Sequence, residues 1–255
     1  MYPSACIEWL FEDDCPDFAD RIRAAKAAGL SHVEFHLWRD KPMDKVAQAL
    51  RETGVTLTSF CVDPRRSLVD PAQHGEFIEA VRDSLVASQQ VGSPPLIVAS
   101  GFTREGVSRA EQRAAAIKAL TEAACLAEAA GIELLVEPLN TRIDHPGMFL
   151  HDTRETLDII EAIGSPHLKL LFDVYHSSVM DESLEEVLAG RMHLVRHVQI
   201  ADLPGRNEPG TGQLDWSDLL QRLKALGYQQ AIGLEYKPTL PSLQSLASAR
   251  QATGL

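Results

Sequence analysis

The chain has 255 residues and carries 36 acidic against 24 basic side chains, which gives a formal net charge of −12 at neutral pH. This balance argues against a nucleic acid or an anionic membrane surface as partner, because both are bound through clustered lysine and arginine. With 45% hydrophobic residues, a chain of this length is expected to bury a core without help from disulfides.

Cysteine usage and the first residues of the chain bear on its compartment. The four cysteines are widely scattered and show neither zinc spacing nor a C-x-x-C motif; they are Cys6, Cys15, Cys61 and Cys125. The first residues lack the basic and apolar segments of a signal peptide, and no stretch reaches the ~18 apolar residues of a membrane span. We therefore expect a soluble cytoplasmic protein with reduced thiols.

A repeating pattern runs along the chain. Seven times a helix-like stretch ends in glycine and a short apolar run follows, with a mean spacing of about 33 residues, the size of one strand–helix unit. Glycine suits these positions because the residue after a helix commonly adopts a left-handed conformation. The seven glycines are Gly29, Gly54, Gly92, Gly131, Gly164, Gly190 and Gly227.

The apolar runs predict eight strands, which alternate with helices. They are expected near 5–10, 32–37, 56–61, 96–99, 133–137, 168–173, 195–199 and 231–235, with a last helix near 241–252. Ser108 with Glu111, and Asp152 with Glu155, have the form of capping boxes, and Asp215 can cap a helix that opens at Trp216. This order predicts an α/β protein with one domain over residues 1–255, a single (β/α)8 TIM barrel. A doubly wound open sheet remains the alternative, because counting units does not prove closure.

Four consecutive predicted strands end in side chains that carry oxygen. These are Glu137, Asp173, Gln199 and Glu235. In a closed barrel the carboxyl ends of the strands meet on one face, where barrel enzymes place their chemistry. Three carboxylates held together repel unless a cation compensates, and carboxylate and amide oxygens suit Mg²⁺ or Mn²⁺. The pattern predicts a divalent-metal site.

The second half of the chain resembles the hydroxypyruvate isomerase family, within the wider group of xylose isomerase-like barrels. The resemblance runs from about Gly131 to Pro238, through VEPLNTR, LKLLFDVYH and AIGLEYKP, and HVQIADLPGR-x-EPGTG is its most specific string. Over residues 1–130 the IEWLFED start and the HVEF segment fit loosely, and the segment CVDPRRSLVDP looks shorter than the usual loop.

The resemblance implies that Glu137, Asp173, Gln199 and Glu235 bind the metal, and that Glu137 and Glu235 are also the catalytic proton acceptor and donor. This chemistry is consistent with isomerisation of a 2-hydroxy aldehyde to its 2-keto partner. A carboxylate on each side of the substrate can exchange protons with neighbouring carbons, while a cation stabilises the enediolate.

Four further residues are candidates for substrate binding. His176 follows Asp173 by three residues and could bind a substrate oxygen, or cap the next helix. Arg206 and Glu208 are the next candidates: the guanidinium of Arg206 suits a substrate carboxylate, or the two residues could pair to stabilise their loop. Glu34 could contact substrate at the mouth of the barrel, or pair with Arg39.

Weaker candidates are His36, at the end of the same predicted strand as Glu34, and the pair Arg65 and Arg66. The arginine pair is either solvated surface or a selector of acidic or phosphorylated substrates. The remaining histidines show no ligand spacing and are interpreted as structural or surface residues; they are His32, His74, His145, His151, His167, His193 and His197.

The prediction is thus a metal-dependent isomerase that converts hydroxypyruvate to 2-hydroxy-3-oxopropanoate. A 2-oxo-tetronate-type sugar acid isomerase and a ketose 3-epimerase are alternatives, although Gln199 stands where such epimerases use histidine. An endonuclease IV-like nuclease would need strand-end histidines and a basic face. A sugar-acid binding protein without catalysis is the alternative from another class. The sequence leaves open the substrate length, the metal and whether the chain forms a homo-oligomer.

Overall fold

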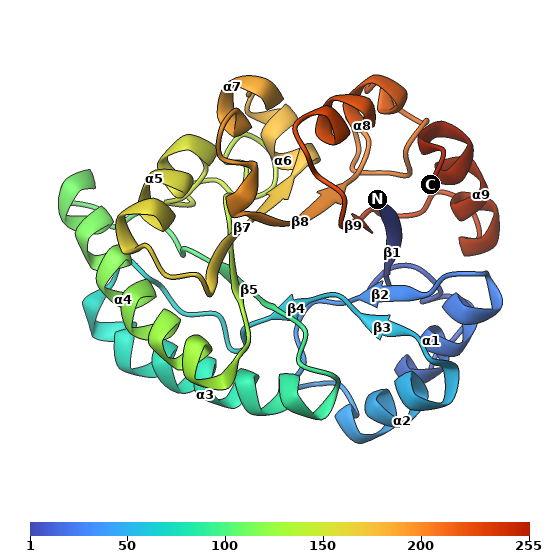
Figure 1. The fold of residues 1–255 in the computed structure, drawn as a ribbon, viewed down its shortest axis with the longest axis horizontal. Coiled ribbons are helices and arrows are strands. Elements are labelled where there is room, and N and C mark those ends of the chain that lie inside the picture. The colour runs from blue at the N-terminus through green and yellow to red at the C-terminus, as the bar shows by residue number, and fades with distance from the viewer.

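The computed structural model describes residues 1–255, and its strands form one closed ring surrounded by helices (Figure 1). All neighbouring strands that pair are parallel, and the pairing order is β3-β2-β1-β9-β8-β7-β6-β5-β4. The strands are β1 (Tyr2–Cys6), β2 (His32–Glu34), β3 (Thr56–Leu57), β4 (Phe60–Cys61), β5 (Leu96–Ala99), β6 (Leu134–Glu137), β7 (Leu168–Asp173), β8 (Val195–Ile200) and β9 (Ala231–Leu234).

Nine strands appear where eight were expected, because the third strand position is split in two. The β3 segment pairs with β2, the β4 segment pairs with β5, and two residues separate them. Backbone bonds bridge the interruption, since Thr58 N donates to Val33 O (2.8 Å) and Cys61 N donates to His36 O (2.8 Å). The ring is therefore closed, and the predicted (β/α)8 barrel is confirmed over the open-sheet alternative.

The helices form an outer ring around the strands (Figure 1). They are α1 (Phe18–Ala27), α2 (Met43–Thr53), α3 (His74–Gln90), α4 (Arg109–Ala130), α5 (Thr153–Ile163), α6 (Val174–Val179), α7 (Leu184–Leu188), α8 (Trp216–Ala225) and α9 (Ser242–Thr253). None of them is both long and apolar enough to cross a lipid bilayer.

Most predicted helix ends are confirmed. Ser108 and Glu111 form a complete capping box at the start of α4, and Asp152 and Asp215 cap α5 and α8 through their side chains. All seven glycines of the repeat have positive φ, between +66° and +101°. A Cβ would strain this conformation, which is why the repeat is visible in the sequence.

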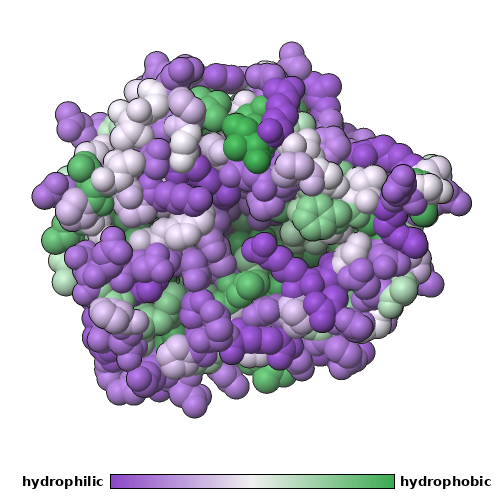
Figure 2. Space-filling model, turned by 180° about the vertical axis from the view of Figure 1, so that it is seen from behind, coloured by the Kyte–Doolittle hydropathy of each residue, from purple (hydrophilic) through white to green (hydrophobic).

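Apolar side chains fill the layer between strands and helices. One cluster of 67 buried residues spans this layer, and α4 contributes Ala116, Leu120, Ala123 and Ala127 to it. The outer surface is mostly hydrophilic, with apolar side chains in small separate patches (Figure 2). Burial of this layer holds the strands in register and so fixes which side chains meet at their ends.

The inside of the barrel has two unlike halves. On one half Cys61, Ile97, Leu135 and Leu171, from β4 to β7, form a small apolar cluster of their own. On the other half polar side chains from β1, β2, β8 and the interruption between β3 and β4 bond to one another: Ser4, Glu34, His197 and Thr58. Side chains two residues further along these strands lie on the same face and one layer nearer the carboxyl ends.

Candidate active site

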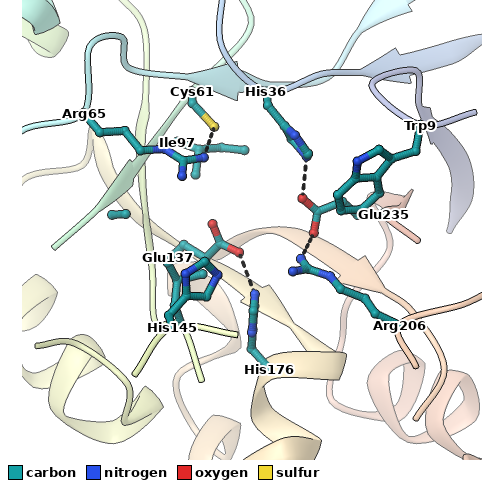
Figure 3. A pocket seen from close by; sticks show the side chains of 12 residues that line it. Trp9, His36, Cys61, Arg65, Ile97, Glu137, His145, His176, Arg206 and Glu235 are labelled. Carbon is teal, nitrogen blue, oxygen red and sulfur yellow. Dashed lines mark hydrogen bonds and ion pairs between the residues drawn. The ribbon is translucent and has the colours of Figure 1, made fainter. Parts of the chain in front are cut away.

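A cavity of about 220 Å³ opens above this inner layer, at the carboxyl ends of the strands (Figure 3). Its walls come from residues that end or follow strands all around the barrel. They are Trp9, His36, Cys61, Arg65, Ile97, Ala99, Glu137, Leu139, His145, His176, Arg206 and Glu235. The site therefore lies where the fold predicts chemistry.

Two of the predicted catalytic residues face one another across the cavity. Glu137 ends β6 and Glu235 follows β9, and their carboxylates point toward each other (Figure 3). Both are largely buried, with 8% and 7% of the residue exposed. Two poorly solvated carboxylates that face one another each make ionisation of the other less favourable.

One arginine and one histidine bond the carboxylate of Glu235. Its Oε1 lies 2.8 Å from His36 Nε2, and its Oε2 accepts a hydrogen bond of 2.5 Å from Arg206 Nη2. Burial alone would raise the pKa of Glu235, but the Arg206 charge and the bond from His36 outweigh it and hold the pKa well below the ordinary value. Glu235 is ionised at neutral pH.

Glu137 has no such support. Burial raises its pKa well above the usual range, and the nearby charges of Glu235 and Asp173 raise it further. Arg206 and Arg65 oppose this shift from a distance without cancelling it. In the protein without a metal, Glu137 therefore binds a proton more tightly than Glu235 does. Such opposed environments are typical of an acid and base pair.

Asp173 connects these two sides. Its Oδ1 caps α6 by accepting from Tyr175 N (2.8 Å), while its Oδ2 lies 3.5 Å from both His176 Nε2 and Arg206 Nη2. Burial raises the pKa of Asp173 to about 7, although Arg206 and backbone bonds act in the opposite direction. This carboxylate thus gains its charge near neutral pH.

His176 has a defined tautomer. Its Nδ1 faces two donors, the side-chain amide of Asn140 (2.7 Å) and Asn140 N (3.3 Å), so Nδ1 accepts and Nε2 carries the proton. The Asn140 amide is itself oriented, because its Oδ1 accepts from Ile143 N and Asp144 N. Burial, and next the charge of Arg206, lower the pKa of His176 to about 3. His176 is a neutral donor at the cavity wall, and its Nε2 has no hydrogen-bond partner.

Gln199 lies one layer below the cavity, in register with Asp173 on the neighbouring strand. The Nε2 of Gln199 donates to Glu34 Oε1 (2.8 Å). The Oε1 of Gln199 itself is buried and has no hydrogen-bond partner. A carboxylate only accepts, so this bond fixes the orientation of the amide. Glu34 also lies 2.6 Å from His197 Nε2. Gly233 makes room for this group, since a Cβ there would lie 2.5 Å from Glu34 Oε1 and 2.8 Å from Gln199 Cγ.

The structure places two of the candidate substrate-binding residues, Glu34 and Glu208, outside the walls of the cavity. Glu34 is 1% exposed, does not line the cavity and does not pair with Arg39, which bonds Asp83 instead. Glu208 is fully buried and accepts from the backbone and hydroxyl of Thr239, so it fixes a loop rather than lining the cavity. The reason is the same in both cases: each buried carboxylate is already bonded to donors outside the cavity, Gln199 for Glu34 and Thr239 for Glu208.

Arg206 does reach the cavity, but it does not pair with Glu208 as one interpretation expected. Its guanidinium bonds Glu235 and lies between the rings of Trp9 (5.4 Å) and Tyr175 (5.1 Å). The residue has a left-handed backbone, with φ of +56°, and its carbonyl accepts from Lys237 N (2.8 Å). This strain is held by the loop and aims the side chain at the carboxylates.

The donor set fits a hard divalent cation. Carboxylate oxygens of Glu137 and Asp173 lie within 4.8 Å of one another, and Gln199, which pairs with Asp173 in register, adds an unpartnered oxygen. Glu235 Oε2 and Asp173 Oδ2 both lie near Arg206 Nη2, and Glu235 also belongs to a second group of possible ligand atoms, with Cys6 and His36. Oxygen-rich sites with several carboxylates are suited to Mg²⁺ or Mn²⁺.

Several residues of the site were not singled out from the sequence. Trp9 lies in the opening IEWLFED segment, Asn140 follows the fifth predicted strand, and His145 was interpreted as structural or surface. His145 instead lines the cavity, and its ring centroid lies 5.5 Å from that of His176. The only sequence signal for these residues is their closeness to a predicted strand. Many loop residues share that signal, so it does not identify a member of the site.

The fold and the site are those of a barrel enzyme, with acidic residues gathered at the carboxyl ends of parallel strands. Comparison with known proteins identifies the family of barrels to which the chain belongs. A family model described as xylose isomerase-like TIM barrel matches residues 22–252. The chain therefore belongs to the xylose isomerase-like TIM barrel family.

Individual relatives agree with this assignment. A 2-oxo-tetronate isomerase of Cupriavidus necator is 32% identical over 87% of this chain and 87% of its own length. The hydroxypyruvate isomerase of Escherichia coli is 29% identical, covering 87% and 88%. The crystal structure of an AP endonuclease, family 2, from Brucella melitensis superimposes with a TM-score of 0.90 at 30% identity over 97% of both chains. With such relatives, this protein is an isomerase.

Proposed function

We propose that the protein interconverts the keto and aldehyde forms of a small sugar acid, with hydroxypyruvate and 2-hydroxy-3-oxopropanoate as the simplest pair. The observation that carries this proposal is the pair of carboxylates of Glu137 and Glu235, which face one another across one cavity in unlike surroundings, since only Glu235 bonds Arg206 and His36. The isomerase relatives named for hydroxypyruvate and 2-oxo-tetronate support the same class of substrate.

In the forward reaction, ionised Glu235 takes a proton from C3 of hydroxypyruvate, and protonated Glu137 delivers one to C2. One hydroxyl proton moves between the two substrate oxygens, so that atoms and charge balance. Proton exchange with water restores both carboxyl groups between turnovers. General acid and base catalysis by positioned carboxyl groups contributes about 10²- to 10⁴-fold.

The other residues of the cavity stabilise the enediolate and hold the acid and base. His176 presents its Nε2 proton to a substrate oxygen and stays neutral, so it donates a hydrogen bond without losing its proton. Arg206 and His36 keep Glu235 ionised and oriented. Trp9 and Leu139 exclude water from one part of the wall.

A divalent cation, Mg²⁺ or Mn²⁺, held by Glu137, Asp173, Gln199 and Glu235, would polarise the substrate carbonyl and offset the negative charge of the enediolate. This effect matters because a carboxylate with a lowered pKa is a weak base, and the carbon acid must be made correspondingly stronger.

Exchange of hydrogen with solvent tests the proposal directly. Purified protein with Mg²⁺ or Mn²⁺ is mixed in D₂O with hydroxypyruvate, 2-oxo-tetronate and a panel of ketoses, and C–H signals are followed by NMR. We expect deuterium at the exchanging carbon and formation of the aldehyde isomer. A protein that exchanges none of these substrates with either metal would not be a sugar-acid isomerase.

An epimerase acting at C3 of a ketose would also exchange C–H with solvent, and the same panel separates it. Inversion at carbon without keto–aldehyde conversion would identify the epimerase. Binding of sugar acids without any exchange would identify a non-catalytic binding protein.

A further inference from the structure

A second cavity adjoins the first on the side away from Arg206. It has a volume of about 330 Å³ and is lined by Arg65, Arg66, Ser67, Asp70, Gln73, Ala99, Gly101, Phe102, Arg104, His145 and Met148. Arg65, Ala99 and His145 belong to the walls of both cavities, so the two lie directly beside each other. Arg65 enters the catalytic cavity from the opposite side to Arg206 (Figure 3).

The three arginines of the second cavity differ in how their charges are offset. Arg66 bonds Glu76 (2.5 Å), and Arg104 lies 3.7 Å from Asp70. Arg65 makes no ion pair, and its guanidinium contacts only Cys61 Sγ, at 3.9 Å. The catalytic cavity contains another guanidinium, but Arg206 is bonded to Glu235 and lies near Asp173. Arg65 is thus the arginine of the site whose charge is left for a ligand.

The loop that carries Arg65 is fixed by backbone contacts. Leu68 N donates to Ser100 O (2.9 Å), and Ser67 N donates to the side chain of Gln73 (3.0 Å). Gly101 lies so close to this loop that a Cβ would come within 2.8 Å of Ser67 Cα, and its φ of +80° also favours glycine. Binding an anion at Arg65 therefore requires little ordering of the loop.

We propose that Arg65, with the second cavity behind it, forms a subsite for the anionic group of the substrate, a carboxylate or a phosphate. This inference rests on the proposed function, since it assigns one end of the substrate whose reacting carbons lie between Glu137 and Glu235. The subsite moves carboxylate recognition from Arg206, where the sequence suggested it, to the short loop after the third strand. The second cavity is large enough for a phosphate group as well as a carboxylate.

Three substrates with the same number of carbon atoms test the subsite. Hydroxypyruvate carries a carboxylate, dihydroxyacetone phosphate carries a phosphate, and dihydroxyacetone is neutral. Steady-state kinetics of Arg65→Met should show KM raised about 10-fold for at least one of the two anions, because a charge-assisted hydrogen bond is lost at a partly solvated site. For dihydroxyacetone we expect KM within about twofold of wild type. The substrate whose KM rises identifies the group that the subsite binds.

Two further variants sharpen the result. Arg65→Lys keeps the charge and should recover part of the loss, whereas Arg154→Met, which removes an exposed arginine of α5 paired with Glu186, should change nothing. An equal rise for neutral and charged substrates, or no rise for either anion, would overturn the subsite.

Direct binding separates failure of the subsite from failure of the proposed function. Malonate and inorganic phosphate are titrated into wild-type protein and Arg65→Met by calorimetry. If no substrate is turned over but one anion binds and needs Arg65, the subsite stands and the isomerase proposal fails. If the substrates are turned over but neither anion depends on Arg65 in binding or KM, the subsite fails and the isomerase stands.

Discussion

The two halves of the barrel interior shift the pKa of a glutamate in opposite directions, upward for Glu137 and downward for Glu235. Below Glu137 the inner layer is apolar, with Ile97, Leu135 and Leu171 from neighbouring strands. The half that carries Glu235 contains Glu34 and His197 one layer down, and His36 and Arg206 at the level of the carboxylate. Burial is nearly equal for Glu137 and Glu235, so the partners rather than the depth decide which one is ionised.

This difference explains how a symmetrical architecture produces an acid and a base. Eight similar units place similar positions at the strand ends, and a repeated layout alone would give equivalent carboxylates. The asymmetry comes from a few residues that reach one side only, chiefly Arg206 from the loop after β8 and His36 from the end of β2. Substitutions on one half of the barrel that leave the other half unchanged test whether these residues create the asymmetry.

The largest expected effect comes from removing each carboxylate in turn. Glu235→Gln should lower kcat by about 10³-fold or more and abolish C3–H exchange in D₂O, because the base is lost. Glu137→Gln should lower product formation similarly but retain C3–H exchange, since the proton is still removed. Exchange and turnover are both read by NMR, with Glu122→Gln on the exposed face of α4 as control. Identical exchange behaviour in the two variants would contradict their separate roles.

The neutral donor on the Glu137 half is expected to matter next. His176→Ala should lower kcat about 10²-fold, because a preorganised hydrogen bond to the developing oxyanion is lost. Asn140→Ala leaves His176 in place but removes the amide that orients its ring, together with the bonds of that amide to Ile143 N and Asp144, so a loss of about 10-fold is expected. Nitrogen NMR of the histidine ring should show the Nε2–H form in wild type and a mixed population in Asn140→Ala. A ring that keeps its tautomer in the variant would mean that Asn140 does not select it.

On the polar half, Glu34 is expected to act through Gln199. Glu34→Gln can donate as well as accept, so it no longer fixes the orientation of the Gln199 amide, and metal affinity should fall about 10-fold. The measurement is titration with Mn²⁺, followed by the relaxation of water protons. Thermal unfolding provides the control, because a loss of about 1–3 kcal/mol is expected from disturbing this buried group. Unchanged affinity in a folded variant would remove Glu34 from the metal site.

A smaller effect is expected on the stability of the metal-free protein. The folded-state pKa of Asp173, about 7, lies above its ordinary value, so its contribution is complete at acidic pH and is lost as pH rises toward 8. The melting temperature should fall by several degrees between pH 5 and pH 8, and Asp173→Asn should flatten this dependence. Mn²⁺ should raise the melting temperature more at pH 8 than at pH 5, because protons compete with the metal. A metal effect that does not depend on pH would argue against carboxylate ligands of raised pKa.

Much of the fold was readable from local signals. Helix ends such as Gly131 and caps such as Ser108 depend on the backbone of a few residues, and that information is contained in the adjacent sequence. The strand-end residues Glu137, Asp173, Gln199 and Glu235 could be placed for the same reason, because a parallel barrel brings all strand ends to one face. The split third strand was missed, since nothing in the run 56–61 signals an interruption at Thr58 and Ser59.

The roles of the polar side chains were decided only by the tertiary structure. Glu34 and Glu208 look as available in the sequence as Glu235, yet one bonds across the barrel to His197 and Gln199 and the other to Thr239. The sequence by itself determined the net negative charge of the chain, the barrel that the repeated units form, and the oxygen-bearing side chains at the strand ends. The tertiary structure decides which carboxylate is ionised, which arginine is paired and which arginine is left for a ligand. These properties depend on contacts between residues as far apart in sequence as 36 and 235, because electrostatics and hydrogen bonding act through space rather than along the chain.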